Sequence, residues 1–459
     1  MKTFVKCMAI LLAFVFAAGI MLTGCGSTGK KAENVTKPET AKEEAKKEEP
    51  KKEAVKIKYL SWESVVKANQ EAVIKEFEAK NPGIKVEMEF PAENNNGEYM
   101  QKVDIRLLSG EEIDVIVMPG STNLDERARK GIMEPLDGYF TKEGIKYEDK
   151  YTFGVKTEGK TYGIPADVKE WFIMINKNHL DEANLPVPKL DWTWNDYRDY
   201  AKKLTKGEGK DKRYGSYFHN WEQYNYMNMY TTKMDNPLFK DESTHNLAEP
   251  KIKDFIQLRF DLEQKDKVQI PYFEVKSQKM AYRDVFFKGQ ASMVPTGSWM
   301  LVEIKDTAKY PHDFVTTFAP LPRWKDGPEG YTFTESHFYS VASNSKKKDE
   351  AYKFIRFLTT EGMKIKAAGL SAEKGADSGK LVDNIVAGGE KLYDLDGLKK
   401  VLNNPKRTPN VIKNIPPSNK AVVDAINQEA EKFLVGGAKL DDVLAAAIKR
   451  ADEAVKGGK

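Results

Sequence analysis

Strand-like and helix-like hydrophobic patterns alternate along the first part of this 459-residue chain, and this alternation restricts the fold more than any other feature. Apolar residues recur at every second position over 55–59 and 84–90, whereas 66–77 and 99–107 carry them at helical spacing. The apolar run 115–118 is typical of a strand buried on both faces of a parallel sheet. The order strand, helix, strand, helix, strand predicts an α/β fold with an open parallel sheet.

Open sheets of this kind bind ligands beyond the carboxyl ends of their strands. In this chain those ends lead into the segments 61–64, 91–96 and 119–122. We therefore expect the three segments to form one rim of a binding site.

A second set of predicted elements follows, and a chain of this length has room for two or more lobes. Thr193 and Asp196 have the spacing of a helix N-cap pair, and the helix that they begin is expected to end near Leu204. The other predicted elements are strands over 172–176, 291–295 and 338–342, a helix over 351–358, and two C-terminal helices divided by Gly436 and Gly437.

The N-terminus has the composition of an export signal. Two early lysines precede an apolar run over 7–22, and small residues follow. The run is shorter than the ~20 residues that span a bilayer, so a retained transmembrane anchor is the less favoured alternative. Leu22-Thr23-Gly24-Cys25 resembles the lipobox of bacterial lipoproteins, which implies that Cys25 becomes the acylated first residue. We expect a signal peptide over 1–24 and a membrane anchor made by the lipid on Cys25.

The segment 25–54 is rich in lysine and glutamate and nearly free of apolar residues. Such a composition cannot bury a core and predicts a solvated tether. A partner-binding helix is the alternative, although Pro50 disfavours a long one.

Composition and motifs exclude several classes of function. The 73 Lys and Arg nearly balance the 69 Asp and Glu, so a nucleic-acid partner is not expected. Two Cys and five His offer little for a disulfide scaffold or a metal site. Phosphate-binding glycine loops, the G-x-S-x-G elbow and the H-E-x-x-H motif do not occur. We therefore expect no catalytic residues, no cofactor and no metal site.

Aromatic residues are plentiful, with 7 Trp, 20 Tyr and 22 Phe, and several tryptophans lie at expected turns. Flat rings match the C–H faces of pyranose sugars, while neighbouring carboxylates and amides pair with hydroxyl groups. We expect Trp299 and Trp221, and then Trp62, to face a ligand. Packing in a core is the alternative for each and is expected for Trp171, Trp192, Trp194 and Trp324.

Four segments share their order and spacing with one protein family. They are Asp114-Val-Ile-Val-Met-Pro-Gly, Thr161-Tyr-Gly-Ile-Pro-Ala-Asp ahead of Ile175-Asn-Lys-Asn, Phe287-Lys-Gly-Gln-Ala-Ser-Met-Val-Pro-Thr-Gly-Ser-Trp, and Tyr339-Ser-Val-Ala-Ser-Asn-Ser-Lys-Lys-Lys-Asp-Glu-Ala-Tyr-Lys-Phe-Ile. From Val55 to its end, the chain resembles the extracellular solute-binding proteins of ABC transporters, sugar-binding family 1, the class that includes maltose-binding protein.

The resemblance implies a two-lobed periplasmic-binding-protein fold with a ligand cleft between the lobes. Hinge crossovers are expected near Ala166 and over 318–333. Lobe one would comprise 55–166 and 320–372, and lobe two would comprise 167–319 and 373–459.

The resemblance also suggests residues of the ligand site. Positions that match family contacts are Trp62, Ser64, Gly120, Ser121, Asp167, Lys169, Trp221, Tyr224 and Trp299. Four polar residues on the same expected rims complete the predicted site: Glu93, Asn94, Glu335 and His337. The chain departs from the family at 334–337, where relatives are richer in glycine, and at 417–419, where some relatives have an aromatic residue.

The predicted function is that of a lipid-anchored substrate-binding protein of an ABC importer on the outer face of the cell membrane. It would capture a carbohydrate by hinge closure, as a monomer, and deliver it to the membrane permease. Three alternatives stay open: a non-sugar solute (peptide, polyamine or a metal chelate held by Tyr224 and Tyr226), a secreted glycoside hydrolase, and a structural surface lipoprotein.

Overall fold

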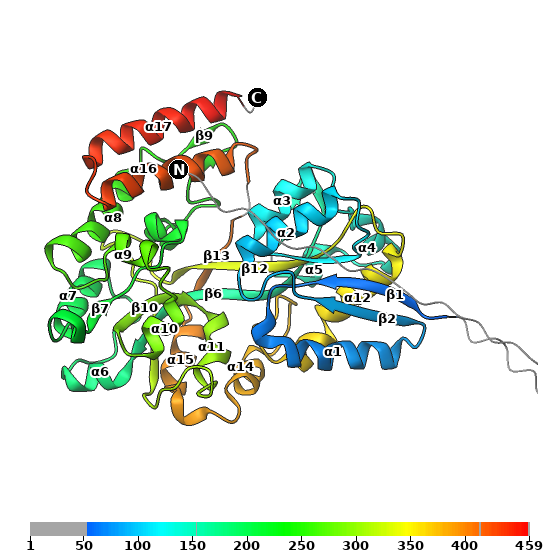
Figure 1. Cartoon of the computed structure of the whole chain (residues 1–459), viewed down its shortest axis with the longest axis horizontal. Helices are drawn as coiled ribbons and strands as arrows, with labels where there is room; N and C mark the ends of the chain where they lie inside the picture. The colour runs from blue at the N-terminus through cyan, green and yellow to red at the C-terminus, as the bar shows by residue number, and fades with distance from the viewer. Residues whose placement is uncertain (1–52, 153, 413–414, 458–459) are drawn as a thin grey trace, which may run out of the picture. The chain divides into compact units, whose positions relative to one another are not determined.

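The computed structural model describes residues 53–152, 154–412 and 415–457 (Figure 1). The predicted signal peptide, Cys25 and nearly all of the tether lie outside the described residues. Within the described ranges, no helix is both long and apolar enough to cross a membrane.

A nine-stranded sheet organises the described part of the chain, with the order β2-β1-β3-β12-β6-β10-β7, while β11 pairs with β6 and β13 pairs with β12. Two further pairs, β4 with β5 and β8 with β9, are separate from it. The strands are β1 (Val55–Leu60), β2 (Ile84–Glu89), β3 (Val115–Met118), β4 (Lys156–Thr157), β5 (Lys160–Thr161), β6 (Ile164–Asn176), β7 (Tyr214–Ser216), β8 (Phe239–Asp241), β9 (Thr244–His245), β10 (Ala291–Gly297), β11 (Thr316–Pro320), β12 (Tyr331–Val341) and β13 (Thr408–Asn410).

Helices cover both faces of this sheet (Figure 1). The α-helices are α1 (Lys67–Lys80), α2 (Asn96–Leu108), α3 (Ser121–Arg129), α4 (Asp137–Glu143), α5 (Tyr147–Lys150), α6 (Lys177–Glu182), α7 (Trp194–Leu204), α8 (Pro250–Phe260), α9 (Tyr272–Ser277), α10 (Tyr282–Phe287), α11 (Leu301–Ile304), α12 (Lys348–Leu358), α13 (Glu361–Lys366), α14 (Ser378–Val386), α15 (Leu395–Leu402), α16 (Asn419–Leu434) and α17 (Leu440–Gly457). Shorter turns are the 3-10 segments η1 (Ser64–Val66), η2 (Gly209–Asp211), η3 (Glu222–Asn225), η4 (Met227–Thr231), η6 (Ser298–Met300) and η7 (Glu390–Leu392), and the π-helical turn η5 (Asp261–Lys265).

The predicted βαβαβ unit is confirmed. Strand β1 lies between β2 and β3 and runs parallel to both, with Val55 opposite Ile84 and Tyr59 opposite Val115. Figure 1 shows α1 along one face of these strands and α2 and α3 on the other. The carboxyl ends of β1, β2 and β3 therefore meet at one edge, as the hydrophobic pattern predicts.

Two long strands, β6 and β12, connect the lobes. The first half of β6 pairs with β12, and its second half pairs with β10 and β11. The last residues of β12 pair with β3. Asp167 lies opposite His337 and Pro165 lies opposite Phe338, so Ala166 is an extra residue on β6 and forms a bulge.

Strand β6 begins eight residues earlier than the predicted strand 172–176. Charged residues at 167, 169 and 170 break the apolar pattern of its first half. They are nevertheless buried, because the structure gives them partners of opposite charge. Polar and charged residues likewise interrupt the apolar pattern in the first half of β12, so this half was not predicted as a strand.

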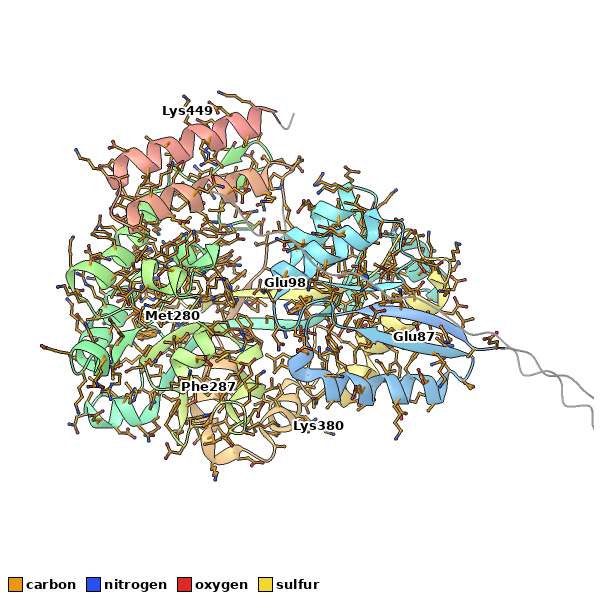
Figure 2. All side chains as sticks on the ribbon, viewed as in Figure 1. Glu87, Glu98, Met280, Phe287, Lys380 and Lys449 are labelled. Atoms are coloured by element: carbon orange, nitrogen blue, oxygen red, sulfur yellow. The ribbon has the colours of Figure 1, made fainter. Side chains whose placement is uncertain are left out.

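Each lobe has its own hydrophobic core, so the expected two-lobed α/β architecture is observed. One core surrounds Tyr59, Phe77 and Phe354. Two adjoining clusters fill the other lobe, one around Trp171 and the other around Phe172. Figure 2 shows the side chains that fill the space between strands and helices in both lobes.

The short connection between β13 and α16 returns to lobe one. Ile415, in the range predicted for lobe two, is buried in the lobe-one core. Arg129 on α3 donates a hydrogen bond to the Ile415 carbonyl over 3.2 Å.

Local signals predicted several helix ends correctly. Thr193 and Asp196 form a reciprocal capping box, and α7 ends at Leu204. Gly436 adopts a positive φ of 82° between α16 and α17, where glycine avoids the strain of a left-handed conformation.

Candidate functional site

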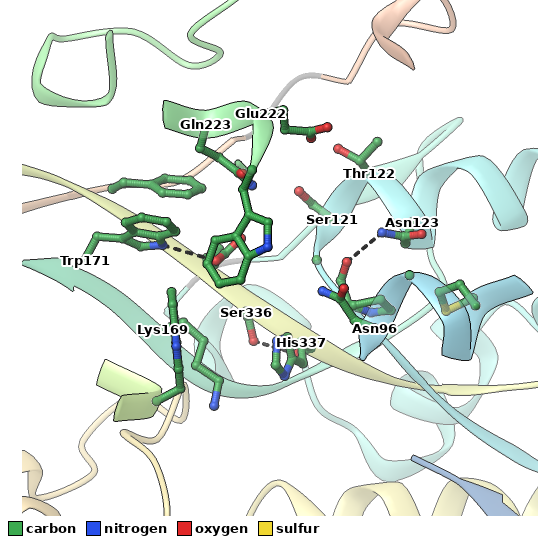
Figure 3. Close-up of a pocket in the computed structure, with 18 of the residues that line it drawn as sticks. Asn96, Ser121, Thr122, Asn123, Lys169, Trp171, Glu222, Gln223, Ser336 and His337 are labelled. Atoms are coloured by element: carbon green, nitrogen blue, oxygen red, sulfur yellow. Dashed lines mark hydrogen bonds between the residues drawn. The ribbon is translucent and has the colours of Figure 1, made fainter. Parts of the chain in front are cut away.

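A cavity of about 1040 Å³ lies between the two lobes (Figure 3). All three rim segments that follow β1, β2 and β3 contribute to its wall, as do β6, β12 and the loops 219–223 and 279–283. The predicted site residues that line the cavity are Trp62, Asn94, Gly120, Ser121, Lys169, Trp221, Trp299, Glu335 and His337.

The lobe-two wall of the cavity is built around Trp171. Its ring meets Trp299, Phe333 and Trp221 at centroid distances of 5.2, 5.6 and 6.2 Å. The Trp171 indole N–H donates a hydrogen bond to Glu335 Oε1 over 3.2 Å, drawn as a dashed line in Figure 3. Trp171 was expected to pack in a core; it is almost fully buried, yet it also lines the cavity.

Trp299 is held in place by its neighbours. Its Nε1 donates to the Tyr282 hydroxyl over 3.0 Å. Arg283 lies 4.6 Å from the Tyr282 ring centre and makes two hydrogen bonds to the buried Glu303, of 2.8 and 2.7 Å. The Trp299 ring also folds back over Gly297, where a Cβ atom would approach it to 2.0 Å.

Sequence reasoning missed Tyr282, Arg283 and Glu303 as parts of the site. Glu303 lies twenty residues beyond Arg283, and no local pattern relates the two. Only the packing of α10 against the segment after β10 brings them together.

On lobe one, Trp62 supplies the aromatic surface. It is 6% exposed and contacts the rings of His337 and Tyr99 at centroid distances of 4.6 and 5.1 Å. His337 Nδ1 lies 3.2 Å from Glu63 Oε1, so β12 is linked to the loop after β1.

Buried charges lie between this wall and the connecting strands. Lys366 donates to Glu63 over 3.1 Å, and Lys169 donates to Asp167 over 2.6 Å while lying 3.8 Å from Glu63. Burial opposes ionisation of Glu63, but Lys366, His337 and Lys169 together hold its pKa well below the usual range. Burial likewise disfavours the charged form of Lys366, yet the Glu63 and Asp167 carboxylates raise its pKa above the ordinary value. The group therefore forms a buried ion-pair network.

Four predicted site residues do not line the cavity. Ser64 and Glu93 lie on the loops beside it, 3.5 Å apart at their side-chain oxygens. Asp167 is buried behind Lys169. Tyr224 is buried because its hydroxyl turns inward and donates to the Pro295 carbonyl over 2.5 Å.

Several uncharged polar residues that line the cavity were not named individually as site residues, although some of them lie in the predicted rim segments 91–96 and 119–122. Figure 3 shows Asn96, Thr122 and Asn123 on lobe one and Gln223 on lobe two. Asn95 also accepts a hydrogen bond from the Glu98 amide and caps α2.

Metal ligation has little support in this geometry. Among the described residues, no group of three or more His, Cys, Asp or Glu is arranged to hold a metal ion. The Tyr224 hydroxyl, one of the two considered as an iron ligand, donates its hydrogen bond to the backbone.

Two α/β lobes, connected by shared strands and lined on facing walls by rings and polar groups, define a solute-binding protein. The chain belongs to the bacterial extracellular solute-binding protein family, whose model matches residues 61–365. Membership of this extracellular family indicates an extracytoplasmic location.

Individual relatives are similar to this chain over most of its length. The multiple sugar-binding protein of Streptococcus mutans is 26% identical over 316 residues, which are 67% of this chain and 71% of the relative. An ABC substrate-binding protein of Listeria monocytogenes, solved in complex with cycloalternan, is 21% identical with a TM-score of 0.73 over 88% of this chain and 99% of the other. A sugar transporter structure from Rhizobium etli, in an open conformation, is 24% identical with a TM-score of 0.67 and the same coverages.

Proposed function

We propose that this protein is the substrate-binding lipoprotein of an ABC importer and that it captures a carbohydrate, specifically an oligosaccharide. One observation carries the proposal: tryptophans line the cavity from both lobes, with amide, hydroxyl and carboxylate groups between them. Rings stack on the apolar faces of pyranoses, and the polar groups pair with their hydroxyls.

The size of the cavity and the names of two relatives support an oligosaccharide. At about 1040 Å³ the cavity lies at the upper end of the ~300–1,000 Å³ found for small-molecule sites, so it offers more room than one sugar ring needs. The Streptococcus mutans relative is named for sugar binding, and the Listeria monocytogenes protein holds a saccharide.

We assign ligand contact to residues that line the cavity. Stacking is assigned to Trp62, Trp171, Trp221 and Trp299, and hydrogen bonding to Asn94, Gly120, Ser121, Lys169, Glu335 and His337. Asp167 and Tyr224 support this wall from behind. Ser64 and Glu93 would reach the ligand only when the lobes close.

Binding works through hinge closure in this proposal. A ligand shifts the open and closed populations only by binding one of them better, and the closed form contacts it from both lobes. Strands β6 and β12 would bend near the bulge at Ala166. The permease would then recognise the closed form and accept the sugar when the lobes part.

A thermal-shift screen of residues 53–459 against plant and bacterial oligosaccharides tests the proposal. A ligand at 100 times its Kd should stabilise the protein by about 2.7 kcal/mol. Stabilisation by a peptide or polyamine and by no saccharide would replace the carbohydrate assignment. Appearance of shortened saccharides would instead indicate a hydrolase.

Lipid anchoring is tested separately with the full chain in bacterial cells. Labelled palmitate should be incorporated into the wild-type protein and not into Cys25→Ala. Equal labelling of the two would contradict the lipobox assignment.

A further inference from the structure

The cationic side chains that line the cavity have acidic partners with one exception. The pairs among the described residues are Lys169 with Asp167, Lys366 with Glu63, Arg127 with Asp104, Arg283 with Glu303, Lys276 with Glu431, and Lys420 with Asp424. Lys279 has no ion pair within the described ranges and is exposed. The other described lysines and arginines of the wall are therefore neutralised by the protein's own carboxylates.

The histidines of the cavity wall do not supply a further cation. Burial, together with the charges of Arg259 and Arg283, lowers the pKa of His219 to about 3, so its ring is neutral. His337 is already engaged by Glu63.

Two carboxylates in the cavity lack such partners. Glu222, at the start of η3, forms no hydrogen bond or ion pair with any described residue, and in Figure 3 its side chain extends toward Thr122 of the opposite lobe. Glu335 on β12 accepts a hydrogen bond from the Trp171 indole N–H and from no other side chain that the structure describes. Burial raises the pKa of both carboxyl groups above the ordinary value, and neither has an ion-pair partner among the described residues.

Both carboxylates lie near aromatic side chains of the wall, although Glu335 is half-buried and Glu222 is exposed. Burial, and then the charges of Glu335 and Glu222, raise the pKa of Tyr230 well above its usual value, so both carboxylates lie near one buried phenol. Tyr230 stacks on Phe333 at 3.7 Å between ring centres. Around the half-buried Glu335, low local polarity strengthens the repulsion between a carboxylate and any further anion.

We infer that Glu222 and Glu335 are specificity-determining residues that restrict the cavity to saccharides without an anionic group. A uronate, sulfate or phosphate on the ligand would meet two carboxyl groups without ion-pair partners, whereas every described lysine and arginine of the wall except exposed Lys279 already has an acidic partner. Neutral saccharides, by contrast, can donate their hydroxyls to both glutamates. This inference rests on the proposed carbohydrate function.

A paired screen tests the charge preference. The probes are trigalacturonate against its methyl ester, aldotetraouronic acid against xylotriose, and maltose phosphate against maltose, each titrated calorimetrically at low salt. We expect every binder to be uncharged. An acidic probe that binds as well as its neutral partner overturns the inference but leaves the proposed function standing, whereas binding of no saccharide at all contradicts both.

Variants test the two residues themselves. Glu222→Gln and Glu335→Gln keep the shape of each side chain and remove its charge. We expect the preference for the neutral member of a pair to fall roughly tenfold or more in at least one variant, as removal of one nearby like charge predicts. The ratio of the two affinities is compared, because either variant also changes hydrogen bonds to a neutral ligand.

Glu453→Gln provides the control, since Glu453 is an exposed residue of α17 that does not line the cavity. It changes the net charge of the protein equally and should leave the ratio unchanged. An unaltered ratio in both single variants and in the double variant, with melting temperatures near wild type, would overturn the assignment.

Discussion

At the scale of single residues, the site depends on how a few rings are oriented. Trp221 and Trp299 face the cavity, whereas Tyr224, only three residues after Trp221, turns its hydroxyl into the core. Trp192 and Trp194 are buried away from the cavity. Proximity to a turn therefore does not decide whether an aromatic residue is available to a ligand.

Trp299→Ala should weaken saccharide binding by about 2 kcal/mol or more, because it removes a ring anchored in the centre of the wall. Titration calorimetry with the saccharide found in the screen measures the loss. Trp324→Ala is the matched control, since Trp324 packs against the same core without lining the cavity. Equal affinities of wild type and Trp299→Ala would remove Trp299 from the site.

Gly297→Ala should weaken binding almost as much while the fold persists. The backbone of Gly297, with φ −119° and ψ 173°, suits any residue, but the new methyl group would collide with the Trp299 ring and displace it. In a Trp299→Ala background the same substitution should have little further effect on affinity. Additive losses would show that Gly297 acts independently of Trp299.

At the scale of elements, the shared strands β6 and β12 carry both the connection and the site. Charged residues on β6 are buried in pairs, and the register of β12 on β6 sets Glu335 opposite Lys169 in the lining of the cavity. Glu170 on β6 pairs with Arg407 from the segment before β13, while its Oε1 has no hydrogen-bond partner among the described residues. Burial consequently raises the pKa of Glu170 to about 7, despite the opposing charge of Arg407.

This shift makes stability depend on pH in a definite direction. Between the ordinary pKa of about 4.5 and about 7, the folded protein holds the Glu170 proton more tightly than the unfolded chain. The contribution is fully present below pH ~4.5 and is lost as pH rises through the folded pKa, at a cost of up to roughly 3 kcal/mol.

Glu170→Gln should therefore lose less stability than wild type between pH 5 and pH 8, as measured by urea unfolding at both values. Glu453→Gln controls for the change in net charge. Identical pH dependence of wild type and Glu170→Gln would show that Glu170 titrates normally in the folded protein.

At the scale of the whole molecule, the proposed function requires a change in the relative position of two lobes with separate cores. The chain has two cysteines, Cys7 and Cys25, so residues 53–459 contain none. Thiol-reactive dyes will therefore label only those cysteines that are introduced by substitution. Exposed Lys130 at the end of α3 and exposed Ala438 between α16 and α17 offer one position on each lobe.

In a Lys130→Cys and Ala438→Cys protein, energy transfer between two dyes should change when a saccharide binds, and Trp299→Ala should require more ligand for the same change. A pair placed within lobe one, Lys130→Cys with Lys75→Cys, should report no change. If energy transfer between the dyes on the two lobes is the same without ligand and at saturating ligand, hinge closure is contradicted.

The sequence alone determined the local features. Alternating apolar residues predicted β1 and β2, and the continuous apolar run 115–118 predicted β3. The Thr193 and Asp196 pair predicted the start of α7, and the strand ends located all three rim loops on lobe one. These features depend on neighbours within a few residues, so their physical causes are contained in short segments.

Only the tertiary structure decided the rest of the site. Lys366 reaches Glu63 across more than 300 positions, and Glu335 meets Trp171 across a sheet. Whether a charged or aromatic side chain is buried, paired or free depends on which distant residue supplies its partner. Glu222 and Glu335 were visible as acidic residues in the sequence, but their lack of a cation became apparent only when every described lysine and arginine of the cavity wall except Lys279 proved to have another partner.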